Sequence, residues 1–192
     1  MKLFKLLTLA LMFLSTTNVD PLKSIPSKGF VIIRYNYFLS EKPTPEGAWE
    51  DYQLDLTERH ISLIGTYPDT SILHVGEKYY NNPKYMSAPL VGVSKVQFIA
   101  FCKWRSDYFN KLKNYWPPWC SNKYWRQIHK GDPNNEYKIE FFIPAYKDVK
   151  DVAFLDCKYR TMFSDTIVGE PNPAFNNDSA YTFYTAARYV KR

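Results

Sequence analysis

The most regular pattern in this sequence runs from residue 94 to about residue 113 and predicts an amphipathic helix. Ser94 and Gln97 have the spacing of a capping box, in which each side chain bonds a free backbone amide at the start of a helix. Behind them, side chains that would share one face recur at steps of three and four, and this face is expected in the core. They are Phe98, Cys102, Arg105, Phe109 and Leu112, with Val96, Ile99 and Ala100 widening the stripe. Cys102 is therefore expected to be a buried thiol.

Other segments predict strands and a second helix. Residues 29–39 are β-branched and aromatic, as in a first strand or hairpin arm, and residues 137–143 alternate up to Pro144. Thr44 before Pro45 is a typical helix start, with the threonine hydroxyl capping free amides. A helix is expected over 45–58, and its core face would be Trp49, Tyr52 and Leu56.

The rest of the chain is richer in loops. Residues 67–70 predict a turn, and the loop that follows, through residue 83, is expected on the surface. A short helix over 147–154 would turn Val149, Val152 and Ala153 inward, and residues 161–177 are expected to be irregular. Residues 180–190 would form the last strand.

These elements predict a single α+β domain in which mixed sheets are flanked by helices and joined by many loops. The chain has 192 residues, of which 18% are aromatic, whereas disordered chains contain few aromatic residues. Its 13 prolines against 7 glycines indicate stiff loops.

The N-terminus has the order of a secretory signal peptide. Lys2 and Lys5 precede an apolar run over 6–14, which is about half the roughly 20 residues that a membrane-spanning helix needs. We expect a signal peptide over 1–18, a linker over 19–28 and the domain over 29–192. The mature protein would then be exported to the periplasm or the cell surface, without a membrane span. The alternative is a buried amphipathic N-terminal helix.

Charge and cysteine content exclude several classes of partner. The net charge of +6 falls to +4 without Lys2 and Lys5, and no later basic run indicates nucleic acid. Cys102, Cys120 and Cys157 allow at most one internal disulfide, whose pairing stays open. The cysteines form no Cys-x-x-Cys pair and lie apart from the three histidines, so we expect no metal and no cofactor.

No complete catalytic motif is present in the sequence. Carboxylate pairs such as Glu50 and Asp51, Asp55 and Glu58, or Asp148 and Asp151 are expected on solvated helix faces. The serines lack a Gly-x-Ser-x-Gly turn, and no glycine-rich phosphate loop occurs. The chain is therefore not expected to be an enzyme.

Residues 88–94 (APLVGVS) and 100–106 (AFCKWRS) resemble the formylglycine-generating enzyme (sulfatase-modifying factor) family. That family has a Pro-Val-Val-Gly-Val-Ser segment that leads into a helix with a Tyr-Cys-x-Trp-like signature. Residues 67–70 are similar to the branch of gliding-motility and type IX secretion lipoproteins. Residues 141–149 and 185–190 resemble two later sequence blocks of the family in which several of the family's characteristic residues are replaced. The resemblance implies a fold related to C-type lectins.

The departures from this family bear on activity. Its enzymes oxidise a sulfatase cysteine with a copper-binding cysteine pair near the C-terminus, but no cysteine follows Cys157 here. The family's calcium-binding loops are also missing, so the resemblance implies a degenerate, truncated scaffold rather than an oxidase. An atypical oxidase would need two of the three cysteines to lie side by side in a cleft.

We therefore expect an exported, non-catalytic binding or assembly module in cell-envelope, secretion or gliding machinery. Loops 67–89 and 114–130 would contact a partner protein, because rigid aromatic side chains give large contact area at low entropic cost. The candidate residues are Tyr79, Tyr80, Tyr85, Trp116, Trp119 and Trp125. Two alternatives stay open: a lectin-like module that stacks glycans on the three tryptophans, and a decayed paralogue without a retained role. A further possibility for residues 116–120 (WPPWC) is that they form a stiff aromatic corner that packs against the core instead of binding a ligand.

Overall fold

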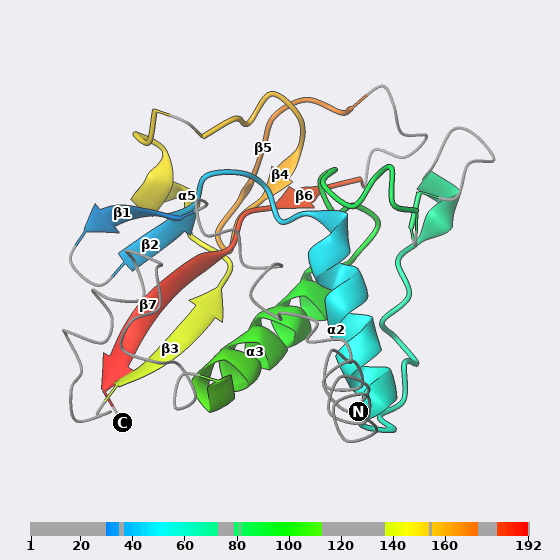
Figure 1. Cartoon of the computed structure of the whole chain (residues 1–192). Coiled ribbons are helices and arrows are strands. Elements are labelled where there is room, and N and C mark those ends of the chain that lie inside the picture. The colour runs from blue at the N-terminus through cyan, green and yellow to red at the C-terminus, as the bar shows by residue number, and fades with distance from the viewer. Residues whose placement is uncertain are drawn as a thin grey trace, which may run out of the picture.

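The structure is a computed structural model with an α+β architecture (Figure 1). It describes residues 30–34, 37–72, 79–80, 82–112, 137–153, 155–172 and 180–191. The expected signal peptide over 1–18, the linker over 19–28 and the loop over 114–130 lie outside the described residues.

A four-stranded antiparallel sheet forms the centre of the fold. Its strands are β1 (Phe30–Arg34), β2 (Tyr37–Ser40), β7 (Ala186–Lys191) and β3 (Tyr137–Phe142), in that spatial order. The predicted first strand is thus a hairpin of two strands, and the prediction of a strand over 137–143 is confirmed by β3. The single last strand predicted over 180–190 is confirmed only from Ala186 on, because residues 182–183 form a separate short strand in a second, smaller sheet. The last strand is an inner strand that joins the hairpin to β3.

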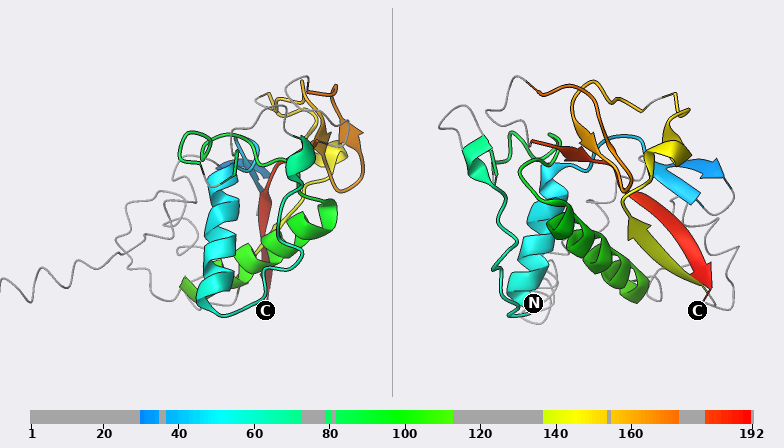
Figure 2. Two further views of the ribbon diagram at one scale, coloured as in Figure 1. Left: turned by 90° about the vertical axis from the view of Figure 1, so that its right-hand side faces the viewer. Right: turned by 180° about the vertical axis from the view of Figure 1, so that it is seen from behind.

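Helices α2 (Glu46–Glu58) and α3 (Lys95–Leu112) lie on one face of this sheet, as Figures 1 and 2 show. A core cluster fills the space between them, with Trp49 and Tyr52 from α2, Phe98 and Phe101 from α3, and Ile139 from β3. Aromatic side chains on both helices and the sheet therefore supply most of the buried area on this side.

The opposite face of the sheet carries a second cluster. It contains Tyr37, Leu39 and Ala186 of the sheet, Val149 of α5 (Tyr146–Val149), and Phe163. Beside it lies a small sheet in the order β5 (Ile167–Val168), β4 (Thr161–Met162) and β6 (Thr182–Phe183). The expectation that 161–177 is irregular was wrong at β4 and β5, because β4 pairs in parallel with β6 about twenty residues later. A 3-10 turn, η1 (Thr70–Ile72), completes the described elements.

Helix α3 begins as predicted, but its outer face differs from the prediction. The Ser94 amide donates to Gln97 Oε1 at 2.6 Å and the Gln97 amide to Ser94 Oγ at 3.2 Å, so the capping box is confirmed. Cys102 is buried, also as predicted. Val96 and Ile99 are 77% and 52% exposed, and Ala100 is exposed too. Their assignment to the core was wrong, because these three residues point away from the face that packs on the sheet.

Two smaller predictions were also wrong. The Thr44 hydroxyl does not cap α2; it contacts the Thr185 hydroxyl at 2.6 Å, and the Glu46 and Gly47 amides donate to the backbone carbonyls of Ala88 and Met86. A tertiary contact thus replaces the local cap. After α5, Ala153 is exposed rather than inward, because the helix ends at Val149.

Candidate functional site

The structure brings three of the predicted contact residues together in a tyrosine platform, composed of Tyr79, Tyr80 and Tyr85. The rings of Tyr79 and Tyr85 stack with centroids 5.0 Å apart and an interplanar angle of 21°. The Tyr80 ring meets the Tyr79 ring edge-on at 5.4 Å. The Lys84 ammonium lies over the Tyr85 ring, 5.2 Å from its centroid, so the platform combines π faces with a positive charge.

Backbone carbonyls hold the tyrosine platform in place. The hydroxyls of Tyr79 and Tyr80 donate to the carbonyls of Pro89 and Val91, each at 2.7 Å. Tyr79 also packs against a small cluster of buried Val91 and Ala180. Burial raises the pKa of both hydroxyls above the ordinary tyrosine value, so they stay protonated donors at neutral pH. The prediction that this loop lies on the surface was right only in part, because these tyrosines are half-buried.

The other three predicted contact residues, Trp116, Trp119 and Trp125, lie outside the described residues, as does Cys120. Stacking of a glycan on these tryptophans therefore stays a prediction.

The two described cysteines lie on opposite sides of the main sheet. Cys102 belongs to the cluster under α3, whereas Cys157 packs against the cluster on the other face, and both are free thiols. Burial raises the pKa of Cys102 to about 12, and burial followed by the Asp156 charge raises that of Cys157. Neither thiol is therefore activated toward nucleophilic or redox chemistry.

One of the predicted carboxylates, Asp55, has a structural role. Asp55 accepts a 2.6 Å hydrogen bond from Trp104 Nε1 and pairs with Arg59 at 2.9 Å. Its side chain is therefore a link between α2 and α3 rather than part of a solvated face, which corrects the prediction for this residue.

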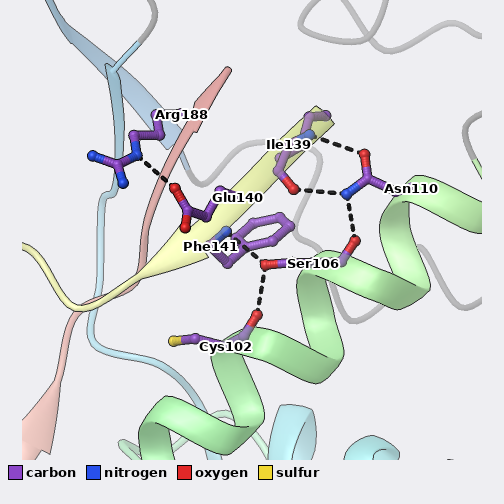
Figure 3. Close-up of polar contacts among 7 residues, drawn as sticks. All are labelled: Cys102, Ser106, Asn110, Ile139, Glu140, Phe141 and Arg188. Carbon is purple, nitrogen blue, oxygen red and sulfur yellow. Dashed lines mark hydrogen bonds and ion pairs between the residues drawn. The ribbon is translucent and has the colours of Figure 1, made fainter. Parts of the chain in front are cut away.

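A polar clamp joins α3 to the outer edge of β3 (Figure 3). Asn110 accepts from the Ile139 amide at 2.9 Å and donates to the Ile139 carbonyl at 2.7 Å. Ser106 Oγ accepts from the Phe141 amide at 2.8 Å and donates to the Cys102 carbonyl at 2.7 Å. Because the serine hydroxyl is committed to backbone groups, the clamp is a structural device and not a nucleophile with its base.

A second surface, which the sequence did not predict, lies where the loop over 61–67 meets the start of α3 (Figure 2, left). Gln97 Nε2 donates to the carbonyls of Gly65 and Tyr67, at 2.8 and 3.1 Å. From α2, Trp49 Nε1 and Gln53 Nε2 donate to the Thr66 carbonyl, at 3.0 and 3.1 Å. These four bonds hold the loop in place from both helices.

The loop nevertheless turns apolar side chains to solvent. Ile64 is 91% exposed and Tyr67 is 66% exposed, and the outer face of α3 continues the apolar character. We define the loop–helix surface by its residues Ile64, Tyr67, Val96, Ile99, Ala100 and Lys103. Exposed apolar groups gathered in this way are typical of interaction sites. The sequence shows these residues as apolar, and three of them, Val96, Ile99 and Ala100, were predicted to lie in the core; which of them are exposed depends on tertiary packing.

In the described part of the chain, no three His, Cys, Asp or Glu side chains gather in a way that could hold a metal ion. No helix of that part is both long enough and apolar enough to span a bilayer.

Comparison of the chain with protein-family models, curated proteins and solved structures found no match in any of the three.

Proposed function

We propose that this chain is an exported, non-catalytic binding module that docks another protein of the cell envelope through the tyrosine platform. The observation that carries the proposal is the fixed geometry of the platform. Both bonded hydroxyls are anchored on backbone carbonyls at 2.7 Å, and Tyr85 is stacked on Tyr79. Rings that are ordered before binding lose little entropy when a partner covers them.

The neighbourhood of the platform also fits a protein contact. Met86 follows Tyr85 directly and is exposed, and Lys84 adds a charge at the rim. Aromatic and methionine side chains surrounded by polar groups are enriched at protein interfaces. The Met86 carbonyl accepts from the Gly47 amide, so the first turn of α2 supports the same segment.

The state of the two described cysteines supports a role without oxidase chemistry. An oxidase of the formylglycine-generating type would use a pair of neighbouring cysteines, but Cys102 and Cys157 belong to clusters on opposite faces of the sheet. Their raised pKa values favour the unreactive thiol form at neutral pH.

We further propose that the scaffold derives from the formylglycine-generating enzyme family, nearest to its gliding-motility and type IX secretion branch. The segment that resembles the family, residues 88–94, has structural roles here. Its Leu90 amide donates to the Thr44 carbonyl, Val91 and Val93 are buried, and Ser94 caps α3. A motif retained for packing supports a common architecture without a common activity.

Site-specific photo-cross-linking in cells would test the protein-binding proposal. A benzophenone amino acid at position 85 should yield a discrete cross-linked protein in the envelope fraction, whereas the same group at exposed Ile167 of β5 should not. The purified partner should bind the mature chain directly, and Tyr85→Ala should weaken that binding about tenfold because an anchor ring is lost.

Two results would overturn the proposal. One is identical cross-linking from positions 85 and 167, which would indicate contact without a specific surface. The other is copper-dependent oxidation of a Cys-x-Pro-x-Arg peptide by the purified protein, abolished by substitution of Cys120 or Cys157, which would identify an enzyme.

A further inference from the structure

The two methionines of the expected mature chain have opposite surroundings. The sequence has four methionines, of which Met1 and Met12 belong to the expected signal peptide. Met86 is 45% exposed and follows Tyr85 directly. Met162 lies in β4, is half-buried and packs against the core cluster that α2 and α3 cover. A small reagent in solution therefore reaches Met86 more easily than Met162.

The segment around Met86 is held in place by backbone hydrogen bonds. The Met86 carbonyl accepts from the Gly47 amide of α2 at 3.0 Å, and the Ala88 amide donates to the Tyr85 carbonyl at 2.7 Å. The Met86 side chain lies over Gly47, because a Cβ added to this glycine would stand 3.4 Å from both Cβ and Cε of Met86. Met86 thus has a defined position at the edge of the tyrosine platform.

We propose that Met86 is an oxidation site that controls binding at the tyrosine platform. Hydrogen peroxide transfers one oxygen atom to the thioether sulfur, and the products are methionine sulfoxide and water. The sulfur loses two electrons and the peroxide gains them. Because the sulfoxide is polar, a partner that covers it has to remove its hydration, so the oxidised chain binds more weakly. This inference rests on the proposed function, since it concerns the same surface.

The exposed position of Met86 separates regulation from damage. A sulfoxide at Met86 stays hydrated in the free protein and leaves the fold intact, whereas a sulfoxide at Met162 would place a polar oxygen against the core. The step is reversible, because methionine sulfoxide reductases restore the thioether. An exported protein also meets oxidants outside the reducing cytosol.

Peptide mass spectrometry tests the site itself, after brief treatment of the purified mature chain with hydrogen peroxide. Met86 should gain one oxygen atom about tenfold faster than Met162, and a methionine sulfoxide reductase should remove it. While only Met86 is oxidised, the melting temperature should stay unchanged. Equal oxidation rates of the two methionines, or unfolding that accompanies oxidation of Met86, would overturn the proposal.

Photo-cross-linking tests the effect on binding. The mature chain with a benzophenone at position 85 is mixed, before and after peroxide treatment, with the partner protein that this position identifies. The yield should fall about fivefold on oxidation and return after the reductase. Met162→Leu should show the same fall. In Met86→Leu the yields before and after peroxide should be equal, which separates the methionine from the cysteines, since thiols also react with peroxide.

The outcomes separate this inference from the proposed function. Equal yields from the reduced and the oxidised chain would overturn the oxidation site and leave the binding module standing. A fall in yield that persists in Met86→Leu would assign the effect to another residue and overturn the role of Met86. If position 85 gives no specific cross-link in either form, the proposed function fails, and the inference about Met86 fails with it.

Discussion

Asn110 replaces a neighbouring strand at the edge of the main sheet. It bonds both the amide and the carbonyl of Ile139, groups that would otherwise form an open strand edge. We expect Asn110→Leu to lower the free energy of unfolding by about 2 kcal/mol, because both backbone groups are partly buried and lose their partner. Urea denaturation would measure the change. Lys111→Ala, at the exposed neighbouring position, serves as the control and should change stability by less than about 0.5 kcal/mol. An equal effect of the two substitutions would contradict the role of the clamp.

Two of the three described glycines with positive φ angles differ in their surroundings. Gly65 has φ +83° and open space where a Cβ would stand, so Gly65→Ala should cost only the backbone strain, about 1–2 kcal/mol. Gly169 has φ +99°, and a Cβ there would lie 2.3 Å from the Cys157 carbonyl oxygen. Gly169→Ala should therefore be clearly more destabilising, and thermal unfolding of the two variants side by side would show it. A smaller destabilisation by Gly169→Ala than by Gly65→Ala would mean that the backbone at Cys157 can move away from the new Cβ at little cost in free energy.

At the scale of elements, Gln97 has two separable functions. Its Oε1 completes the capping box of α3, whereas its Nε2 holds the 61–67 loop. Gln97→Glu keeps an acceptor for the Ser94 amide but loses both donors to the loop. We expect faster hydrogen exchange of the amides over 61–67 with little change in α3, and a loss of about 1 kcal/mol in stability. Gln97→Ala should affect both elements, and exchange that is unchanged in the loop of the Glu variant would contradict this assignment.

The elements that could be predicted from the sequence are those with local signals. The capping box marks the start of α3, and aromatic or β-branched runs mark β3 and β7. The buried thiol of Cys102 also followed from its position on a periodic face. In each case, the pattern of neighbouring residues carries the signal.

The elements that escaped prediction depend on distant partners. Strands β4 and β5 have two residues each, and β4 is held by pairing with residues 167–168 on one side and with residues 182–183 on the other, so no local pattern marks them. Val96 and Ile99 share the apolar character of the core stripe, and only the position of the sheet decides which face of α3 is buried. For the same reason, the loop–helix surface was not predicted. Tyr79, Tyr80 and Tyr85 were predicted as contact residues of one loop, but the stacking of their rings was not.

At the scale of the whole molecule, the main sheet separates two cores and supports two distinct surfaces. The cluster under α2 and α3 contains Cys102, and the cluster beside α5 packs Cys157. The tyrosine platform is hydrogen-bonded to the segment that enters α3, and the loop–helix surface is held by hydrogen bonds from the first turn of that helix. The tyrosine platform and the loop–helix surface thus both rest on the N-terminal end of α3, which the core fixes against the sheet.

Burial of titratable groups in both cores should make the whole fold sensitive to alkali. The pKa of Cys102 is raised from an ordinary 9.0 to about 12, that of Tyr184 from 10.0 to about 12, and those of Tyr79 and Tyr80 upward as well, all mainly by burial. The folded protein therefore keeps protons that the unfolded chain releases above about pH 9. The stability associated with these groups is complete below that pH and is lost as the pH rises.

Buried Arg105 acts in the opposite direction, since burial lowers its pKa from 12.5 to about 10, so the folded state loses this proton before the unfolded state does. Four raised groups should outweigh this one. We expect the free energy of unfolding to fall between pH 9 and pH 11 in urea titrations, with a shallower fall between pH 9 and pH 10 for Cys102→Ala, because the thiol is the first of these groups to ionise in the unfolded chain. A free energy of unfolding that stays constant over this range would show that the buried groups ionise in the folded protein at their ordinary pKa values.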